Sequence, residues 1–157
     1  MPRNFKSTAQ HIKPDPKFGS MLASKLINKI MVGGKKSTAQ KIFYEAIDMA
    51  AKKVEVEEKS EIFEKAVENV RPMLEVRSKR VGGANYQVPR EVKRARQQSL
   101  AIRWIVDNAR KKKGKPMALR LSEELVDAFN GTGASVQWKE NVHKMAEANR
   151  AYAHYAR

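Results

Sequence analysis

Three cations just ahead of a glycine pair form the part of this sequence best suited to binding a polyanion. Arg77, Lys79 and Arg80 precede Gly82-Gly83, and the residues on both sides of the glycines favour extended strands. Two glycines between two strands are typical of a tight hairpin turn. Lysine and arginine side chains bind phosphate oxygens, and the planar arginine fork also suits base edges. The segment therefore predicts a basic ribbon that lies along a nucleic-acid backbone.

Three further basic clusters accompany this ribbon. The first is a segment before residue 15, the second a lysine pair near residue 35, and the third combines the basic residues near residue 95 with those near residue 112. One lysine run is usually a solvated surface, but four separate clusters favour a polyanionic partner. The cations that we expect to bind phosphates are Arg3, Lys6, Lys35, Lys36, Arg77, Lys79, Arg94, Arg96, Arg110, Lys111, Lys112, Lys113 and Lys115.

The whole composition supports the same class of partner. The chain has 157 residues, 41% of them hydrophobic, no cysteine and a net charge of +15. The charge is concentrated in blocks, because residues 71–120 have a net charge of +12 and residues 37–70 a net charge of −3. Such an excess repels itself unless a polyanion neutralises it. No apolar run approaches the roughly 18 residues that span a bilayer, and no secretory signal follows Met1, so a membrane is not expected as the partner.

Other kinds of site find little support in the sequence. Gly34-Lys-Lys-Ser37 resembles a phosphate-binding loop but has Lys29 where that loop needs glycine. It is either a helix stop and restart with solvated cations, or a phosphate grip beside free amides. The three histidines, His11, His143 and His154, are too scattered for a metal site. No catalytic arrangement or nucleotide-binding fingerprint is present, so we expect no metal, no cofactor and no enzymatic activity.

Two aromatic residues have more than one interpretation. Tyr86 follows the glycine turn among cations, where its ring either stacks on a base or packs against the base of the hairpin. Trp104 lies on an apolar helical face and is expected in the core.

Apolar periodicity predicts the elements that position these residues. Asp15-Pro16 offers a helix cap or a turn before a first helix that ends at Gly33, and Ser37 with Gln40 matches a capping box for the second. The remaining helices are expected from about 57–60 to 71, from 94 to 113, from 116 to 129 and from 135 to 149.

The predicted fold is mainly α, a single-domain six-helix bundle with a protruding two-stranded β-hairpin between helices three and four. Residues 1–14 form a basic arm, and residues 15–157 form the helical RNA-binding domain with the hairpin inserted at about 72–92. Pro89 is expected to interrupt the second strand and so to make it an edge strand or a short ribbon. An isolated hairpin is marginal in water, so we expect its base to be held and its tip to become ordered on a partner. The residues expected at the base are Met73, Leu74, Val88 and Val92.

Several longer motifs resemble one known family. They are Asp15-Pro-Lys-Phe-Gly-Ser, Gly34-Lys-Lys-Ser-Thr-Ala, Glu68-Asn-Val-Arg-Pro, Glu75-Val-Arg-Ser-Lys-Arg-Val-Gly-Gly-Ala-Asn-Tyr-Gln-Val-Pro, Arg103-Trp-Ile-Val, Met117-Ala-Leu-Arg-Leu and His143-Lys-Met-Ala-Glu-Ala-Asn-Arg-Ala-Tyr-Ala-His-Tyr. These residues look like ribosomal small-subunit protein seven of the bacterial type, from about residue 14 to the end of the chain. Residues 4–13 and the terminal Ala156-Arg157 depart from the family pattern.

The resemblance implies a structural, non-enzymatic protein without a cofactor. It implies primary binding to the 3′ major domain of small-subunit ribosomal RNA, nucleation of head assembly and a place near the tRNA exit site. Implied partners are exit-site tRNA, the ninth and eleventh small-subunit proteins and, in some members, the messenger RNA of their own operon. The residues assigned to the tRNA side are Arg80, Gly82, Gly83, Tyr86, His143 and Lys144. The expected location is the ribosome in the cytoplasm, with an organellar host still open.

Two rival functions are compatible with parts of the sequence. Helix pairs joined by glycine turns could belong to a helical DNA-binding regulator. An RNA-processing enzyme is the second rival, but it lacks an acid–base or metal constellation.

Overall fold

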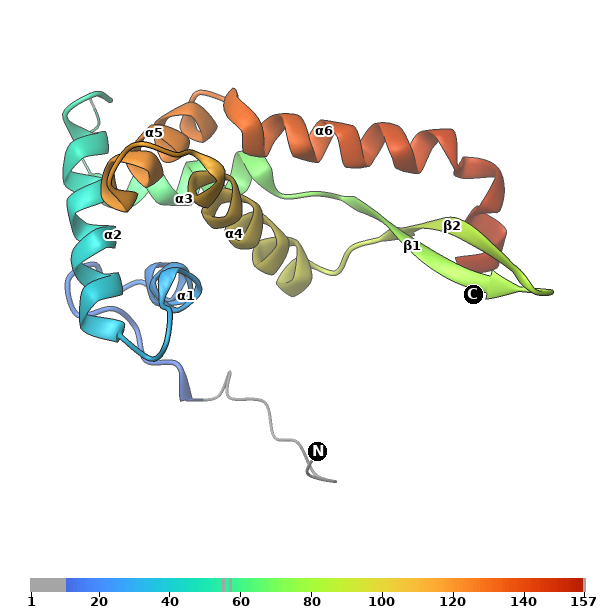
Figure 1. Cartoon of the computed structure of the whole chain (residues 1–157), viewed down its shortest axis with the longest axis horizontal. Helices are drawn as coiled ribbons and strands as arrows, with labels where there is room; N and C mark the ends of the chain where they lie inside the picture. The colour runs from blue at the N-terminus through green and yellow to red at the C-terminus, as the bar shows by residue number, and fades with distance from the viewer. Residues whose placement is uncertain (1–10, 55, 57, 157) are drawn as a thin grey trace.

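The computed structural model describes residues 11–54, 56 and 58–156. Within them the predicted fold is confirmed: six α-helices, with a two-stranded hairpin between the third and the fourth (Figure 1). A short 3-10 helix at the carboxyl end adds to the prediction. In chain order the elements are α1 (Met21–Ile30), α2 (Lys36–Ala51), α3 (Lys59–Val70), β1 (Leu74–Val81), β2 (Ala84–Glu91), α4 (Arg94–Lys111), α5 (Met117–Phe129), α6 (Gly133–Ala148) and η2 (Arg150–Ala156).

The core lies among α1 to α5, with a contribution from the start of α6. The ring of Phe18 meets the rings of Phe43 and Phe63 edge-on, with centroids 6.2 and 5.6 Å apart. Phe43, Phe63, Leu121 and Leu125 are fully buried, and burial of each such side chain contributes about 1.5–3 kcal/mol. Trp104 is half-buried and packs against this core, close to its predicted place.

Two helix starts differ from the sequence prediction. Asp15 closes a turn by accepting hydrogen bonds from the amides of Lys17 and Phe18, and α1 begins later, where Ser20 caps the amide of Leu22 at 3.2 Å. The predicted capping box at Ser37 is wrong. Helix α2 begins one residue earlier at Lys36 and has no side-chain cap, because the Gly33-Gly34 turn delivers the chain to the helix at that point.

Asp15 also joins the amino-terminal turn to α2. The hydroxyl of Tyr44 donates to its Oδ1 atom at 2.7 Å. Burial and the nearby Asp15 carboxylate raise the pKa of Tyr44 to about 12. The phenol therefore stays protonated and keeps donating across the neutral pH range. The predicted arm is tied down where it meets the domain, since Ser24 donates to the carbonyl of Lys13 at 2.7 Å.

The hairpin turns at the predicted glycine pair. β1 and β2 are antiparallel, Val81 pairs with Ala84, and Gly82 and Gly83 have φ angles of 58° and 90°. This two-residue turn requires positive φ at both positions, which glycine adopts without a side-chain clash. The predicted interruption at Pro89 is wrong, because β2 continues through it to Glu91. In a two-stranded ribbon each strand has an outer edge, where a residue without an N–H group is tolerated.

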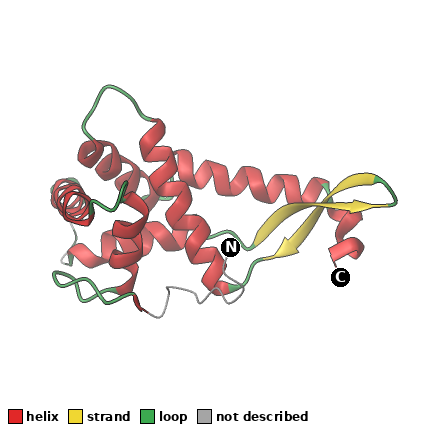
Figure 2. Cartoon of the chain, turned by 60° about the horizontal axis from the view of Figure 1, so that its bottom comes forward, coloured by secondary structure: helices red, strands yellow, loops and turns green. Residues whose placement is uncertain are grey.

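The hairpin is supported along its length rather than at its base alone. α6 extends beyond the bundle beside it, and η2 folds back onto β2 (Figures 1 and 2). Val88 and Val92 are buried as predicted, whereas the prediction for Met73 is wrong, because 73% of this residue is exposed. Its backbone amide, not its side chain, makes the contact with α6: it donates to Nε2 of His143 at 3.1 Å.

Candidate nucleic-acid interface

Helices α1 and α4 form a basic ridge along one side of the bundle. Lys25 bonds to Gln98 at 2.6 Å and Lys29 pairs with Asp107 at 3.3 Å, so the two helices lie side by side. Arg110 donates to the carbonyls of Lys29 and Ile30, both at 3.1 Å. A cation at these carbonyls suits the negative end of the α1 dipole. Arg110, predicted as an RNA ligand, therefore also joins α4 to the end of α1.

The lysine pair at the start of α2 continues this ridge. Lys35 and Lys36 are exposed, and no other described residue pairs with their side chains. Their own amides bond to Val32 and Gly34, so they are not the free amides expected beside a phosphate. Only four residues separate Ile30 from Lys35, which keeps Lys35 within about 18 Å of the end of α1. Both lysines remain available to a partner.

The lysines after Arg110 differ in whether they bond to another group of the protein, and most of them do. Lys112 pairs with the fully buried Glu124 at 3.0 Å, and Lys115 bonds to Glu123 at 2.6 Å. Lys113 is exposed and has no partner in the described part of the chain. Of the three, only Lys113 has an ammonium group uncommitted to a carboxylate.

A buried polar network explains why Lys112 is structural. Oε1 of Glu124 accepts hydrogen bonds from the amide of Ser135 at 3.0 Å and from its hydroxyl at 2.6 Å. The Ser135 hydroxyl accepts from Asn108 at 3.2 Å, and the Asn108 oxygen accepts from Lys111 at 3.2 Å. A buried carboxylate needs such partners to offset its lost hydration. The network joins α4, α5 and α6 and holds both lysines in place.

Glu75 organises the cations at the base of the hairpin. Its carboxylate, on β1, pairs with Arg77 at 2.7 Å and with Arg96 of α4 at 2.8 Å. One negative charge thus orients two guanidinium groups and leaves a net positive charge with unused N–H donors. Arg94, at the start of α4, and Arg80, near the tip, are exposed and pair with no described side chain.

The remaining hairpin residues contact the carboxyl-terminal segment. Lys79 donates to the carbonyl of Tyr155 at 2.7 Å. The ring of Tyr86 lies 5.1 Å from that of Tyr152 and 5.3 Å from that of Tyr155, between centroids. Of the two interpretations of Tyr86, packing is what the structure shows, although against η2 rather than the hairpin base. Gly82 and Gly83 stand beyond these contacts at the tip.

His143 and Lys144 lie on α6 but have different surroundings. Burial, and secondarily the charge of Lys139, lower the pKa of His143, which favours the neutral ring that accepts from Met73. His143 therefore holds the hairpin base to α6. Lys144 is exposed and has no partner among the described residues. Arg3 and Lys6 lie outside the described residues.

Exposed cations that the predicted basic clusters do not include also lie on these helices, among them Lys41 on α2, and Lys93 and Arg103 at and within α4. Arg103 belongs to a polar stripe with Arg96, Ser99 and Arg110, spaced three, four and seven residues apart. That helical spacing could have revealed it, because such residues share one face.

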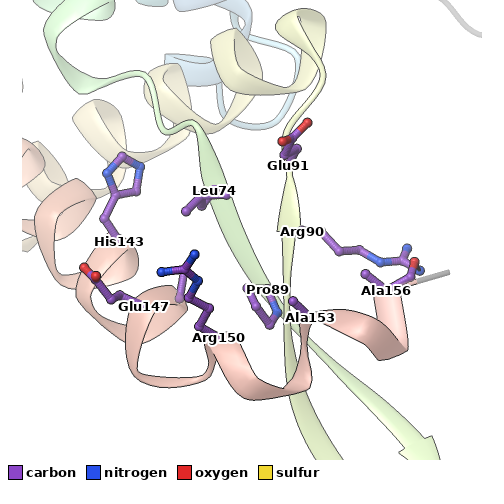
Figure 3. A pocket seen from close by; sticks show the side chains of 10 residues that line it. Leu74, Pro89, Arg90, Glu91, His143, Glu147, Arg150, Ala153 and Ala156 are labelled. Atoms are coloured by element: carbon purple, nitrogen blue, oxygen red, sulfur yellow. Dashed lines mark hydrogen bonds between the residues drawn. The ribbon is translucent and has the colours of Figure 1, made fainter.

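A groove of about 850 Å³ separates the hairpin base from α6 and η2 (Figure 3). Leu74 and Pro89 line its strand side, and His143, Glu147 and Arg150 line its helix side. Because carboxylates and cations alternate around it, the groove is not part of the positive ridge. In the described ranges no three His, Asp or Glu side chains cluster as metal ligands. None of the helices described has the length and apolar character needed to cross a membrane.

Comparison with known proteins places this arrangement in a family. The model of the family "Ribosomal protein S7p/S5e" matches residues 2–150. The chain belongs to the ribosomal protein S7p/S5e family. It is 54% identical to "Small ribosomal subunit protein uS7" of Fervidobacterium nodosum over 98% of both chains. It is 53% identical to the protein of that name from Chloroflexus aurantiacus, over all of this chain and 99% of the relative.

Membership of the S7p/S5e family confirms the predicted resemblance and the expectation of a structural, non-enzymatic protein. The matched segment contains the ridge, the hairpin and α6, and ends at the first residue of η2.

Proposed function

We propose that this protein is a structural constituent of the small ribosomal subunit that binds the 3′ major domain of its ribosomal RNA and nucleates assembly of the head. The observation that carries the proposal is the concentration of cations on one ridge of a family member, several of which pair with no side chain in the described part of the chain. Residues on α1, α4 and the start of α2 supply this ridge, while residues 37–70 have a net charge of −3. RNA junctions are recognised mainly through phosphates and shape, which suits a rigid basic ridge.

The contacts to ribosomal RNA are assigned by availability. The ridge cations without an internal partner would bind phosphates directly, while the paired cations would act where their spare donors face solvent. The direct ligands in this proposal are Lys35, Lys36, Arg94, Arg103 and Lys113.

The hairpin side of the molecule is assigned to the tRNA exit site. The tip with Arg80, Gly82 and Gly83 projects farthest from the bundle (Figure 2). Lys144 is exposed on α6, the helix that lies beside the hairpin. We propose exit-site tRNA and the ninth and eleventh small-subunit proteins as neighbours, with the operon messenger RNA as a further ligand. The protein would act on a bacterial-type ribosome in the cytoplasm.

The two ends of α2 provide a matched test. Lys35→Ala/Lys36→Ala removes two charges from the ridge, and Lys52→Ala/Lys53→Ala removes two from the opposite end, about 24 Å away. The first variant should bind a 3′-domain RNA fragment about tenfold more weakly in filter binding at fixed salt, and the second should bind nearly as the native protein does. Equal losses would contradict a ridge-directed interface.

Two further measurements separate the rival functions. Duplex DNA that displaced the RNA fragment at equal salt would favour a DNA-binding regulator instead. Sedimentation of cell extracts should place the protein on small ribosomal subunits, and recovery entirely as free protein would overturn the proposal.

A further inference from the structure

Trp138 on α6 is an exposed indole beside the basic end of α4. About 44% of the residue is accessible, which makes it one of the large apolar side chains that the fold leaves open. The ammonium group of Lys111 lies 5.3 Å from the centroid of its ring. Base stacking on an exposed aromatic ring, with cations beside it for the phosphates, is how proteins bind unpaired nucleotides.

The cation beside this ring is held in place from the protein interior. Lys111 donates to the oxygen of Asn108, Asn108 donates to the hydroxyl of Ser135, and Ser135 donates to the buried Glu124. The donor–acceptor distances of these three hydrogen bonds lie between 2.6 and 3.2 Å. Ser135 also stands one helical turn before Trp138 on α6. The same network therefore fixes both the cation and the helix that carries the ring, and a pre-organised site loses less entropy on binding.

The charges around the ring favour a phosphate-bearing ligand. Lys112 is matched by Glu124 and Asp127, but Lys113 has no partner in the described part of the chain and follows Lys111 by two residues. The ring thus has one positioned cation beside it, and a cation that has no partner among the described residues follows two residues later in the chain. An apolar protein partner would gain nothing from these two charges.

We propose that Trp138 is a stacking platform for one unpaired RNA base, with Lys111 and Lys113 binding the adjoining phosphates. The inference rests on the proposed function for the choice of RNA as the ligand. It adds a base-binding site on α6, next to the carboxyl end of α4 and so at the border of the phosphate-binding ridge.

Fluorescence tests the stacking directly. In a Trp104→Phe background Trp138 is the sole tryptophan. Titration with single-stranded oligoadenylate, with the 3′-domain RNA fragment and with tRNA should quench its emission and shield it from acrylamide for the RNA that occupies the site. Saturating binding of the 3′-domain fragment and tRNA without any change at Trp138 would overturn the proposal.

Substitutions separate stacking from charge. Trp138→Ala should weaken binding about tenfold without changing its salt dependence, and Trp138→Phe should retain part of the affinity. Met145→Ala is the control, because Met145 is exposed to 48% on the same helix but has no aromatic ring on which a base could stack. Circular dichroism verifies that each variant is folded.

The outcomes distinguish this inference from the proposed function. If Trp138→Ala binds both the 3′-domain fragment and tRNA as the native protein does while Lys35→Ala/Lys36→Ala loses affinity for the fragment, the stacking site is wrong and the ribosomal RNA interface stands. If the native protein does not bind the fragment, both are wrong.

Discussion

At the scale of single residues, lysines that are neighbours in sequence have unlike tasks. Lys112 neutralises a buried carboxylate, Lys115 bonds to a partly exposed one, and Lys113 faces solvent with no partner among the described residues. The difference follows from the carboxylates that α5 places opposite them. A charge count therefore overstates the number of cations ready to bind phosphates in this cluster.

The first prediction compares Glu124 with Glu123, because each of these carboxylates pairs with a lysine of the same loop. Glu124→Ala should lower the free energy of unfolding by about 3 kcal/mol, because it strands Lys112 and the donors of Ser135. Glu123→Ala should cost less than about 1 kcal/mol, because that pair is solvent-exposed. Urea denaturation of the two variants measures the difference. Equal destabilisation would show that burial of Glu124 does not decide the cost.

His143 makes the second prediction, which concerns pH. Its pKa is lowered in the folded protein, mainly by burial, so the unfolded chain takes up a proton that the folded chain resists. The stability that this residue contributes is complete above the unfolded value of about 6.5 and is lost as pH falls through the lowered pKa. Protonated Nε2 can no longer accept from the amide of Met73.

Amide hydrogen exchange at Met73 tests this, after correction for intrinsic rates. Protection should fall between about pH 7 and pH 5, while Val67 in the core of α3 stays protected. His143→Phe should remove the pH dependence at Met73. Protection of Met73 that is unchanged across this range would disprove the role of the ring.

What the sequence could predict at this scale was the location of charge, not its pairing. Asn108, Ser135 and Glu124 come from three helices, so their network depends on packing that no local pattern encodes. Glu75 likewise meets Arg96 only because β1 leaves the bundle beside the start of α4. Periodicity locates elements, but the contacts between them belong to the tertiary fold.

At the scale of elements, the hairpin was predictable and its support was not. Gly82-Gly83 between two strand-favouring runs is a strong local signal. The last residues have no apolar period, and η2 buries none of its residues. Its contacts are tilted pairs of aromatic rings and charge-assisted hydrogen bonds to its carbonyls, which leave no hydrophobic pattern in the sequence. The observed starts of α1 at Met21 and of α2 at Lys36 differ by a few residues from the predicted starts. The reason is similar, because the turn before each helix sets the residue at which the helix begins.

Truncation after Asn149 tests the support of the hairpin by η2. It removes the acceptors of Lys79 and Arg90 and the rings beside Tyr86. Each aromatic pair contributes about 0.5–1.5 kcal/mol, so amides of β2 should exchange severalfold faster. The melting temperature of the bundle should change little, because the core lies in α1 to α6. Unchanged exchange in β2 would mean that α6 alone holds the ribbon.

At the scale of the whole molecule, the fold brings basic residues from separate parts of the chain side by side. The blocks seen in the sequence become a basic ridge on α1, α4 and the start of α2, distinct from the acidic stretch of residues 37–70. At physiological salt exposed charges act over about 8 Å, so a concentrated ridge binds RNA where a dispersed one would not. Composition predicted the sign and the size of the net charge, and the packing of the helices determines where the basic ridge lies.

The salt dependence of RNA binding tests how many ridge cations meet phosphates. Each neutralised phosphate contributes about 0.7–0.9 to the slope of log affinity against log salt. Lys113→Ala should lower that slope by about this amount. Lys115→Ala removes the same net charge, but Lys115 is already bonded to Glu123 at 2.6 Å, and this bond lowers the pKa of the Glu123 carboxyl, which is therefore ionised at neutral pH. The Lys115 variant should therefore keep the native slope. Equal slope changes in the two variants would mean that internal pairing does not decide which cations of this ridge reach the RNA.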